Sequence, residues 1–98
     1  MKLRLSEEAQ RDIETVDAWW RKHRPAAPLL FLQELRAALL QIETNPESGT
    51  PYLGAMKPYR RVLLPKTRYL LYYEYDKPSD LLAVASIWSA RRGKGPEL

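Results

Sequence analysis

The chain has 98 residues, of which 45% are hydrophobic, so it can bury one core and is too short for two typical domains. No cysteine is present, which excludes disulfide bonds and thiolate chemistry. The formal net charge of +4 is uneven: residues 51–98 carry nine Lys/Arg and four Asp/Glu, a balance of +5, whereas residues 1–50 carry −1. We therefore predict an anionic or acidic partner for the second half of the chain.

The first half of the chain predicts a short strand followed by two helices. Residues 2–5 alternate apolar and polar side chains, as a strand does. Ser6 is a typical N-cap for the first helix, whose apolar residues recur at helical spacing until Pro25 ends it. A second helix should begin around Pro25–Pro28, where proline is tolerated in a first turn, and should stop at Asn45-Pro46. Because almost nothing joins the two helices, we expect an antiparallel hairpin.

The second half predicts a loop and three strands. Residues 46–58 are rich in proline and glycine and should form the loop. Strands are predicted near 59–65, 68–76 and 80–89, with turn residues between them. The last strand is almost wholly apolar, so it should lie centrally or be covered on both faces. The tail, residues 93–98, has two glycines and a proline and is predicted to be flexible.

Together these elements predict an α+β fold in a single domain spanning residues 1–98. The order is β-αα-βββ, with the helical hairpin packed on one face of a small antiparallel sheet. Along the strand at 68–76, four side chains share one face and should be core: Tyr69, Leu71, Tyr73 and Tyr75. The other sheet face is left open for basic and tyrosine residues. No apolar run suits a signal peptide or reaches the roughly 20 residues of a membrane span, so we expect a cytoplasmic protein without a membrane partner.

At this level the chain resembles the RelE/ParE-type toxins of bacterial type II toxin–antitoxin systems over nearly its whole length. The resemblance rests on Leu5-Ser6 opening a helix, the loop from Pro46 to Gly49, and Arg61 opening the next strand. It continues through the strand 69–75 and the closing residues 87–92, with the sequence IWSARR. It implies a cognate antitoxin as partner, operator DNA bound only through that antitoxin, and no cofactor.

Two activities occur among such toxins, and the sequence has to be weighed between them. RelE-like members cut mRNA on the ribosome with lysines, arginines and a tyrosine near the C-terminus. Laid on this chain, the strand arginine of that set falls on Leu70, with Arg68 two residues back on the same face, and residues 93–98 contain no tyrosine. A ribonuclease would have to use Lys66, Arg68 and Arg91 instead. Because two of the expected pieces are missing, the ParE-like activity is favoured, which is inhibition of DNA gyrase without catalysis. A RelE-like ribonuclease remains the first alternative, and an inactive homologue that serves only as antitoxin partner or co-repressor remains the second.

The residues expected to carry these contacts fall in two groups. Contacts to the target are assigned to basic residues of the second half: Arg61, Arg68, Arg91, Arg92 and Lys94. Contacts to the antitoxin are assigned to Trp19, Arg60 and Trp88. Arg60 and Arg61 are adjacent and must point to opposite sheet faces, so only one of them can line the open face. The single histidine, His23, has no second ligand nearby, and we expect no metal site.

Overall fold

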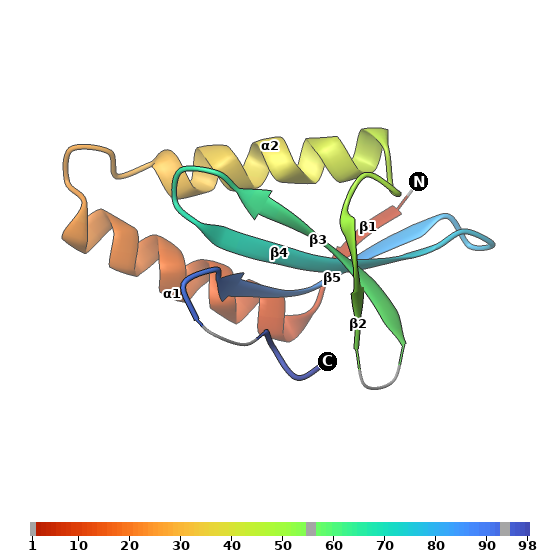
Figure 1. Cartoon of the computed structure of the whole chain (residues 1–98). Helices are drawn as coiled ribbons and strands as arrows, with labels where there is room; N and C mark the ends of the chain where they lie inside the picture. Colours follow the sequence, from red (N-terminus) through yellow and green to blue (C-terminus); the bar gives the residue numbers. More distant parts are fainter. Residues whose placement is uncertain (1, 55–56, 93–94) are drawn as a thin grey trace.

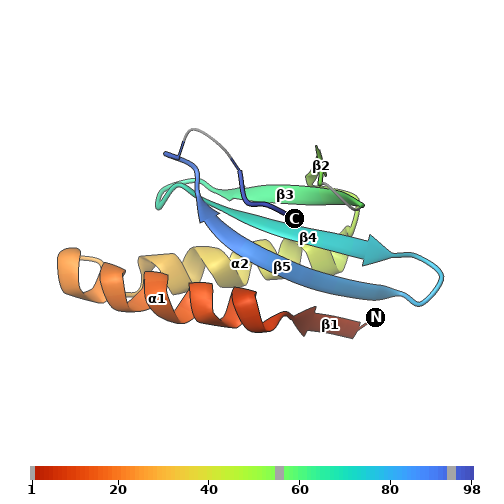
Figure 2. The same cartoon turned by 90° about the horizontal axis from the view of Figure 1, so that it is seen from below.

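The computed structural model describes residues 2–54, 57–92 and 95–98. Within these residues two helices cover one face of a five-stranded sheet (Figure 1; Figure 2). In chain order the elements are β1 (Lys2–Leu5), α1 (Glu7–His23), α2 (Leu30–Thr44), β2 (Thr50–Leu53), β3 (Pro58–Leu64), β4 (Tyr69–Asp76) and β5 (Leu81–Ser89). The predicted α+β class, with a helical hairpin on one sheet face, is confirmed. No described helix is long and apolar enough to cross a membrane.

Helix α1 begins as its sequence predicts. The Ser6 hydroxyl accepts a hydrogen bond from the backbone N–H of Ala9 at 3.0 Å, which satisfies one of the free donors of the first turn. The same hydroxyl donates to the carbonyl of Ala85 at 2.9 Å. The cap therefore also ties the start of α1 to β5.

Helix α2 begins at Leu30, so the prediction of a start around Pro25–Pro28 was wrong. Two successive turns fill the gap, with hydrogen bonds from Ala27 N to Arg24 O (3.0 Å) and from Leu30 N to Ala27 O (3.2 Å). A proline at position 28 disfavours helical geometry in the residue before it, which keeps Ala27 out of the helix. The indole N–H of Trp20 donates to Ala27 O at 2.7 Å and fixes this connection against α1.

The sheet has the order β1-β5-β4-β3-β2 and is mixed. The predicted antiparallel pairing is found among β2, β3, β4 and β5, whereas β1, at one edge, pairs parallel to β5. Local pattern cannot reveal this pairing, since β1 and β5 come from the two ends of the chain and no tight turn sets their direction. The predicted loop 46–58 also contains a strand: Thr50–Leu53 pairs antiparallel with Pro58–Arg61 of β3. The apolar β5 lies between β1 and β4, as its composition predicts.

The core lies between the helices and the sheet. It contains Leu71 and Tyr73 of β4, with Tyr69 and Tyr75 packed against it, so the predicted tyrosine face is confirmed as core. Other members come from the helices and the neighbouring strands: Phe31, Leu35, Ile42, Val62, Leu64, Leu82 and Val84. One irregularity, a register shift opposite Tyr72 and Tyr73, leaves an extra residue in β5.

Candidate functional site

Four basic residues gather at one end of the sheet: Lys66, Arg68, Arg91 and Arg92, hereafter the basic end. Two turns meet there, because the backbone N–H of Ala90, just after β5, donates to Arg68 O at 2.8 Å. All four side chains are exposed. Arg68 was expected on a strand, but it lies in the β3–β4 turn with φ of 66°, a left-handed conformation that is uncommon for residues other than glycine.

Glu34 of α2 clamps the turn that carries the basic end. Its carboxylate accepts three hydrogen bonds, each 2.8 Å long, from the backbone N–H groups of Lys66 and Thr67 and from the hydroxyl of Thr67. Burial alone raises the pKa of Glu34, but these hydrogen bonds and the Lys66 charge together hold that pKa below its ordinary value. The group is therefore a charged anchor for the turn at neutral pH.

The sheet face away from the helices carries an arginine–tyrosine cluster. Val62 and Leu71 face the core, so their neighbours Arg61 and Tyr72 point to the opposite side. The Arg61 guanidinium lies 5.4 Å from the ring centre of Tyr52, and its Nη1 is 3.4 Å from the Tyr72 hydroxyl. Tyr52 and Tyr72 pack edge to face at 4.8 Å, and Tyr72 is fully buried.

The last residues of the chain cover this cluster. Residues 95–98 lie on the sheet face away from the helices (Figure 2), and the Tyr52 hydroxyl donates to Pro96 O at 3.2 Å. We call residues 95–98 the C-terminal strap. The expected flexibility of the tail concerns in part residues 93–94, which lie outside the described residues, as does the predicted contact Lys94.

The two tryptophans expected to contact an antitoxin lie in one groove, whereas Arg60 does not. Trp19 of α1 and Trp88 of β5 both line a cavity of 330 Å³ between these elements, together with Arg92, whose guanidinium lies 4.4 Å from the Trp88 ring centre. Trp19 is 39% exposed.

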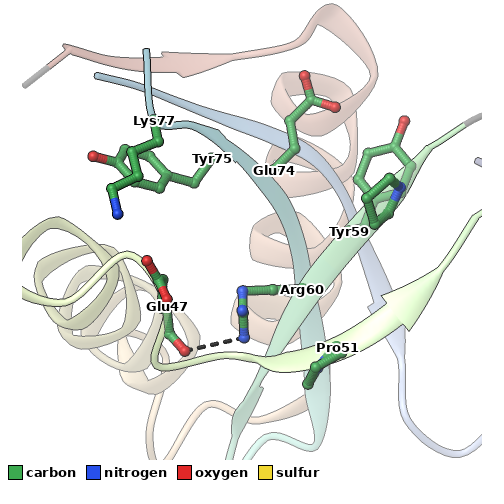
Figure 3. A pocket seen from close by; sticks show the side chains of 8 residues that line it. Glu47, Pro51, Tyr59, Arg60, Glu74, Tyr75 and Lys77 are labelled. Atoms are coloured by element: carbon green, nitrogen blue, oxygen red, sulfur yellow. Dashed lines mark hydrogen bonds between the residues drawn. The ribbon is translucent and has the colours of Figure 1, made fainter. Parts of the chain in front are cut away.

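Arg60 lies elsewhere, on the helix side of β3. Its Nη1 donates to the carbonyls of Glu47 (3.1 Å) and Gly49 (2.8 Å), and it lines a separate cavity of 370 Å³ (Figure 3). The two bonds join β3 to the end of the α2–β2 connection. We therefore assign Arg60 a structural role.

His23 stacks on Trp19 with ring centres 4.5 Å apart, and its Nδ1 lies 2.9 Å from Trp19 O. Within the described ranges no group of three or more His, Cys, Asp or Glu side chains could hold a metal ion.

Three features of the site were missed by sequence reasoning: Glu34, Tyr52 and the C-terminal strap. Glu34 and its partners are more than thirty positions apart, so no local pattern links them. Tyr52 lies in a segment rich in proline and glycine that reads as a loop. The strap contains one residue that could have pointed to it, Gly95, because an added Cβ there would lie 2.5 Å from the Tyr52 hydroxyl oxygen. This close approach can be recognised only once the fold is known.

The fold and the basic end define a class: a small α+β domain that presents cationic side chains at one end of its sheet. Residues 3–93 match the family described as the ParE toxin of the type II toxin–antitoxin system parDE. Because this match covers nearly the whole chain, the protein belongs to that family, and the resemblance to RelE/ParE-type toxins is confirmed.

Solved structures with a similar fold include three of the E. coli toxin RelE. The isolated toxin has a TM-score of 0.61 at 20% identity, covering 95% of this chain and 87% of RelE. The intact RelBE toxin–antitoxin complex has a TM-score of 0.61 at 21% identity, and the match covers 93% of this chain and 98% of the matched chain. A RelE mutant in complex with an antitoxin RelBc peptide has a TM-score of 0.62 at 20% identity, and the match covers 93% of this chain and 84% of the matched chain. At such identities the likeness shows the fold alone. No curated protein matches the chain.

Proposed function

We propose that this toxin is neutralised by a cognate antitoxin and acts by a stoichiometric contact with DNA gyrase rather than by catalysis. The family itself is defined by toxin–antitoxin pairing, and two of the similar structures contain RelE with an antitoxin protein or peptide. Operator DNA would then be bound only through the antitoxin. The basic end and Arg61 are the proposed contacts to gyrase, and the Trp19–Trp88 groove is the proposed contact to the antitoxin.

The observation that carries the non-catalytic assignment is that, among the described residues, the possible proton acceptors nearest the basic end are buried or already hydrogen-bonded. Cleavage of RNA through its 2′-hydroxyl needs a group that takes that proton and an acid for the leaving oxygen. Arginines keep their protons at neutral pH. In the described part of the chain, the nearby Tyr72 is fully buried, and the Tyr52 hydroxyl donates to Pro96. The Glu34 carboxylate already accepts three hydrogen bonds. The Asp12 carboxylate, which lines the groove with Arg92, accepts from the Ser86 hydroxyl and the Ile87 N–H.

A RelE-like ribonuclease is the alternative, and two observations favour it. The solved structures reported above are of RelE, and the meeting of the two turns brings Lys66, Arg68 and Arg91 to one end of the sheet. Under this alternative, Arg68→Ala and Arg91→Ala should each abolish message cleavage on purified ribosomes.

The deciding experiment is induced expression of the chain alone in a bacterium, with DNA and protein synthesis followed by pulse labelling. If DNA synthesis stops first, the proposal holds, and purified gyrase should lose supercoiling activity with the wild-type chain but keep it with Arg91→Ala. Arg36→Ala is the matched control, because Arg36 is an exposed arginine on α2, which lies on the other side of the sheet. If protein synthesis stops first, the ribonuclease alternative is correct. If neither changes, the chain serves only as an antitoxin partner or co-repressor.

A further inference from the structure

A small pocket opens on the sheet face away from the helices, between β3, β4 and the turn after β5. Its volume is 210 Å³, and its lining includes Arg61, Tyr72, Trp88, Ser89, Arg92 and Gly95. The described lining holds two guanidinium groups and no carboxylate. A pocket of this kind has an unbalanced positive charge that a bound anion would neutralise.

Both guanidinium groups are held in place before any ligand arrives. Arg61 lies over the Tyr52 ring and against the Tyr72 hydroxyl, and Arg92 lies over the Trp88 ring. Contact with a ring leaves guanidinium N–H groups able to donate to an oxyanion: Arg61 uses Nη1 for the Tyr72 hydroxyl and keeps its other N–H groups, and Arg92 can donate alongside it. Because the side chains are already ordered, little conformational entropy is lost on binding.

The C-terminal strap forms one wall of this pocket. Gly95 approaches Tyr52 so closely that a Cβ at this position would lie 2.5 Å from the hydroxyl oxygen and 3.0 Å from Cζ. The next residue, Pro96, is buried and accepts the Tyr52 hydroxyl hydrogen bond. A larger residue at position 95 would therefore have to displace the Tyr52 ring or move the strap away from the side of the pocket.

We propose that this pocket binds a carboxylate side chain from an acidic protein segment. Single-stranded nucleic acid would bring a phosphate, but it is usually held by bases stacking on free aromatic faces. Here the Trp88 and Tyr52 rings are each covered by an arginine, and Tyr72 is fully buried. What the pocket offers is paired N–H donors in a space suited to one carboxylate. In naming an acidic protein segment, the inference rests on the proposed antitoxin partnership: an antitoxin segment that continues from the groove past Arg92 would cover Arg61 and Arg92, two of the proposed gyrase contacts, and so neutralise the toxin.

The test uses the full chain and two probes of opposite type, a terminally blocked hexaglutamate peptide and hexathymidylate. Binding is measured by isothermal titration calorimetry at low ionic strength, where the interaction of charges is screened least. Hexaglutamate should bind more tightly than hexathymidylate. Arg61→Gln and Arg92→Gln should each weaken hexaglutamate binding about tenfold, the effect expected from losing one charge-assisted hydrogen bond.

Arg36→Gln is the control for net charge, since it removes the same charge from the opposite side of the sheet. An equal loss with this control would overturn the proposal and indicate a non-specific charge effect. Tighter binding of hexathymidylate, with the same dependence on Arg92, would also overturn it in favour of a nucleic-acid site. Arg61 packs on two tyrosines, so a thermal melt must first show that Arg61→Gln is folded. If Arg61→Gln does not fold, the test rests on Arg92→Gln, because Arg92 is exposed. Hexaglutamate binding can fail while a cognate antitoxin still neutralises the toxin, so the two proposals can fail separately.

Discussion

Removing the Glu34 carboxylate should destabilise the β3–β4 turn that carries Lys66 and Arg68 of the basic end, and so lower the free energy of unfolding. In Glu34→Ala, the backbone N–H and hydroxyl of Thr67, a residue only 4% exposed, lose their acceptor, while the exposed Lys66 N–H can turn to water. Leaving buried donors without a partner costs about 1–3 kcal/mol each, and partial relaxation of the turn lowers the sum. We expect the free energy of unfolding to fall by about 2 kcal/mol, which for a domain of this size lowers Tm by roughly 8–16 °C.

The assay is thermal and urea unfolding followed by circular dichroism at neutral pH, with Glu43→Ala as the matched control. Glu43 is an exposed carboxylate on the same helix, so its removal changes charge and helix propensity without touching the turn. Glu34→Gln keeps one acceptor oxygen and should lose about half as much stability. If Glu34→Ala costs no more than Glu43→Ala, the clamp does not hold the turn and the reasoning is refuted.

The pH dependence of this difference supplies an independent check. The folded-state pKa of Glu34 lies below its ordinary value, so its contribution to stability is fully present above the unfolded-state pKa. It is lost as the pH falls through the folded-state pKa. The stability difference between wild type and Glu34→Ala should therefore stay constant near neutral pH and shrink on acidification. A difference that grew with acid would contradict the assignment.

Three further outcomes follow from contacts of single residues. Tyr73→Phe should lower the free energy of unfolding, measured by chemical denaturation, by about 1–3 kcal/mol, because the buried hydroxyl donates to Pro46 O and accepts from Gly49 N. An unchanged free energy would mean that water replaces the hydroxyl as partner of these groups. Asp12→Ala should lower the free energy of unfolding, measured by thermal melting, by about 1–2 kcal/mol, because the Asp12 carboxylate accepts from the backbone N–H of Ile87 at 3.0 Å and joins α1 to β5. An unchanged Tm would show that this hydrogen bond does not stabilise the fold. Gly95→Ala should release the strap and speed trimming by carboxypeptidase, whereas an unchanged rate would show that the strap tolerates the Cβ.

Several parts of the fold follow from local sequence because the forces that set them are local. Ser6 caps α1 through a hydrogen bond three residues away, so its role can be recognised without the tertiary structure. Side chains alternate along a strand, which is why Tyr69, Leu71, Tyr73 and Tyr75 could be assigned to the core. The start of α2 was misplaced because proline is compatible both with a first helical turn and with the turns that precede a helix.

The arrangement of the basic end was decided by tertiary contacts. Sequence identified Lys66, Arg68, Arg91 and Arg92 as basic residues, but the register of β4 on β5, which sets Tyr69 opposite Ser89, and the bond from Ala90 N to Arg68 O bring the two turns together. Trp19 and Trp88 lie far apart in the sequence, so no local pattern links them. The packing of α1 on β5 places both in one groove.

By itself, the sequence determined the class of fold, the charge of the second half and the membership of the toxin family, because periodicity, composition and motif order are properties of the chain alone. The parallel pairing of β1 with β5, the Glu34 clamp and the cover of Tyr52 by the strap were decided only by the tertiary structure. Each joins segments separated by more than thirty residues. The free energy of such contacts depends on which surfaces meet after folding, and neighbouring residues carry no signal of it.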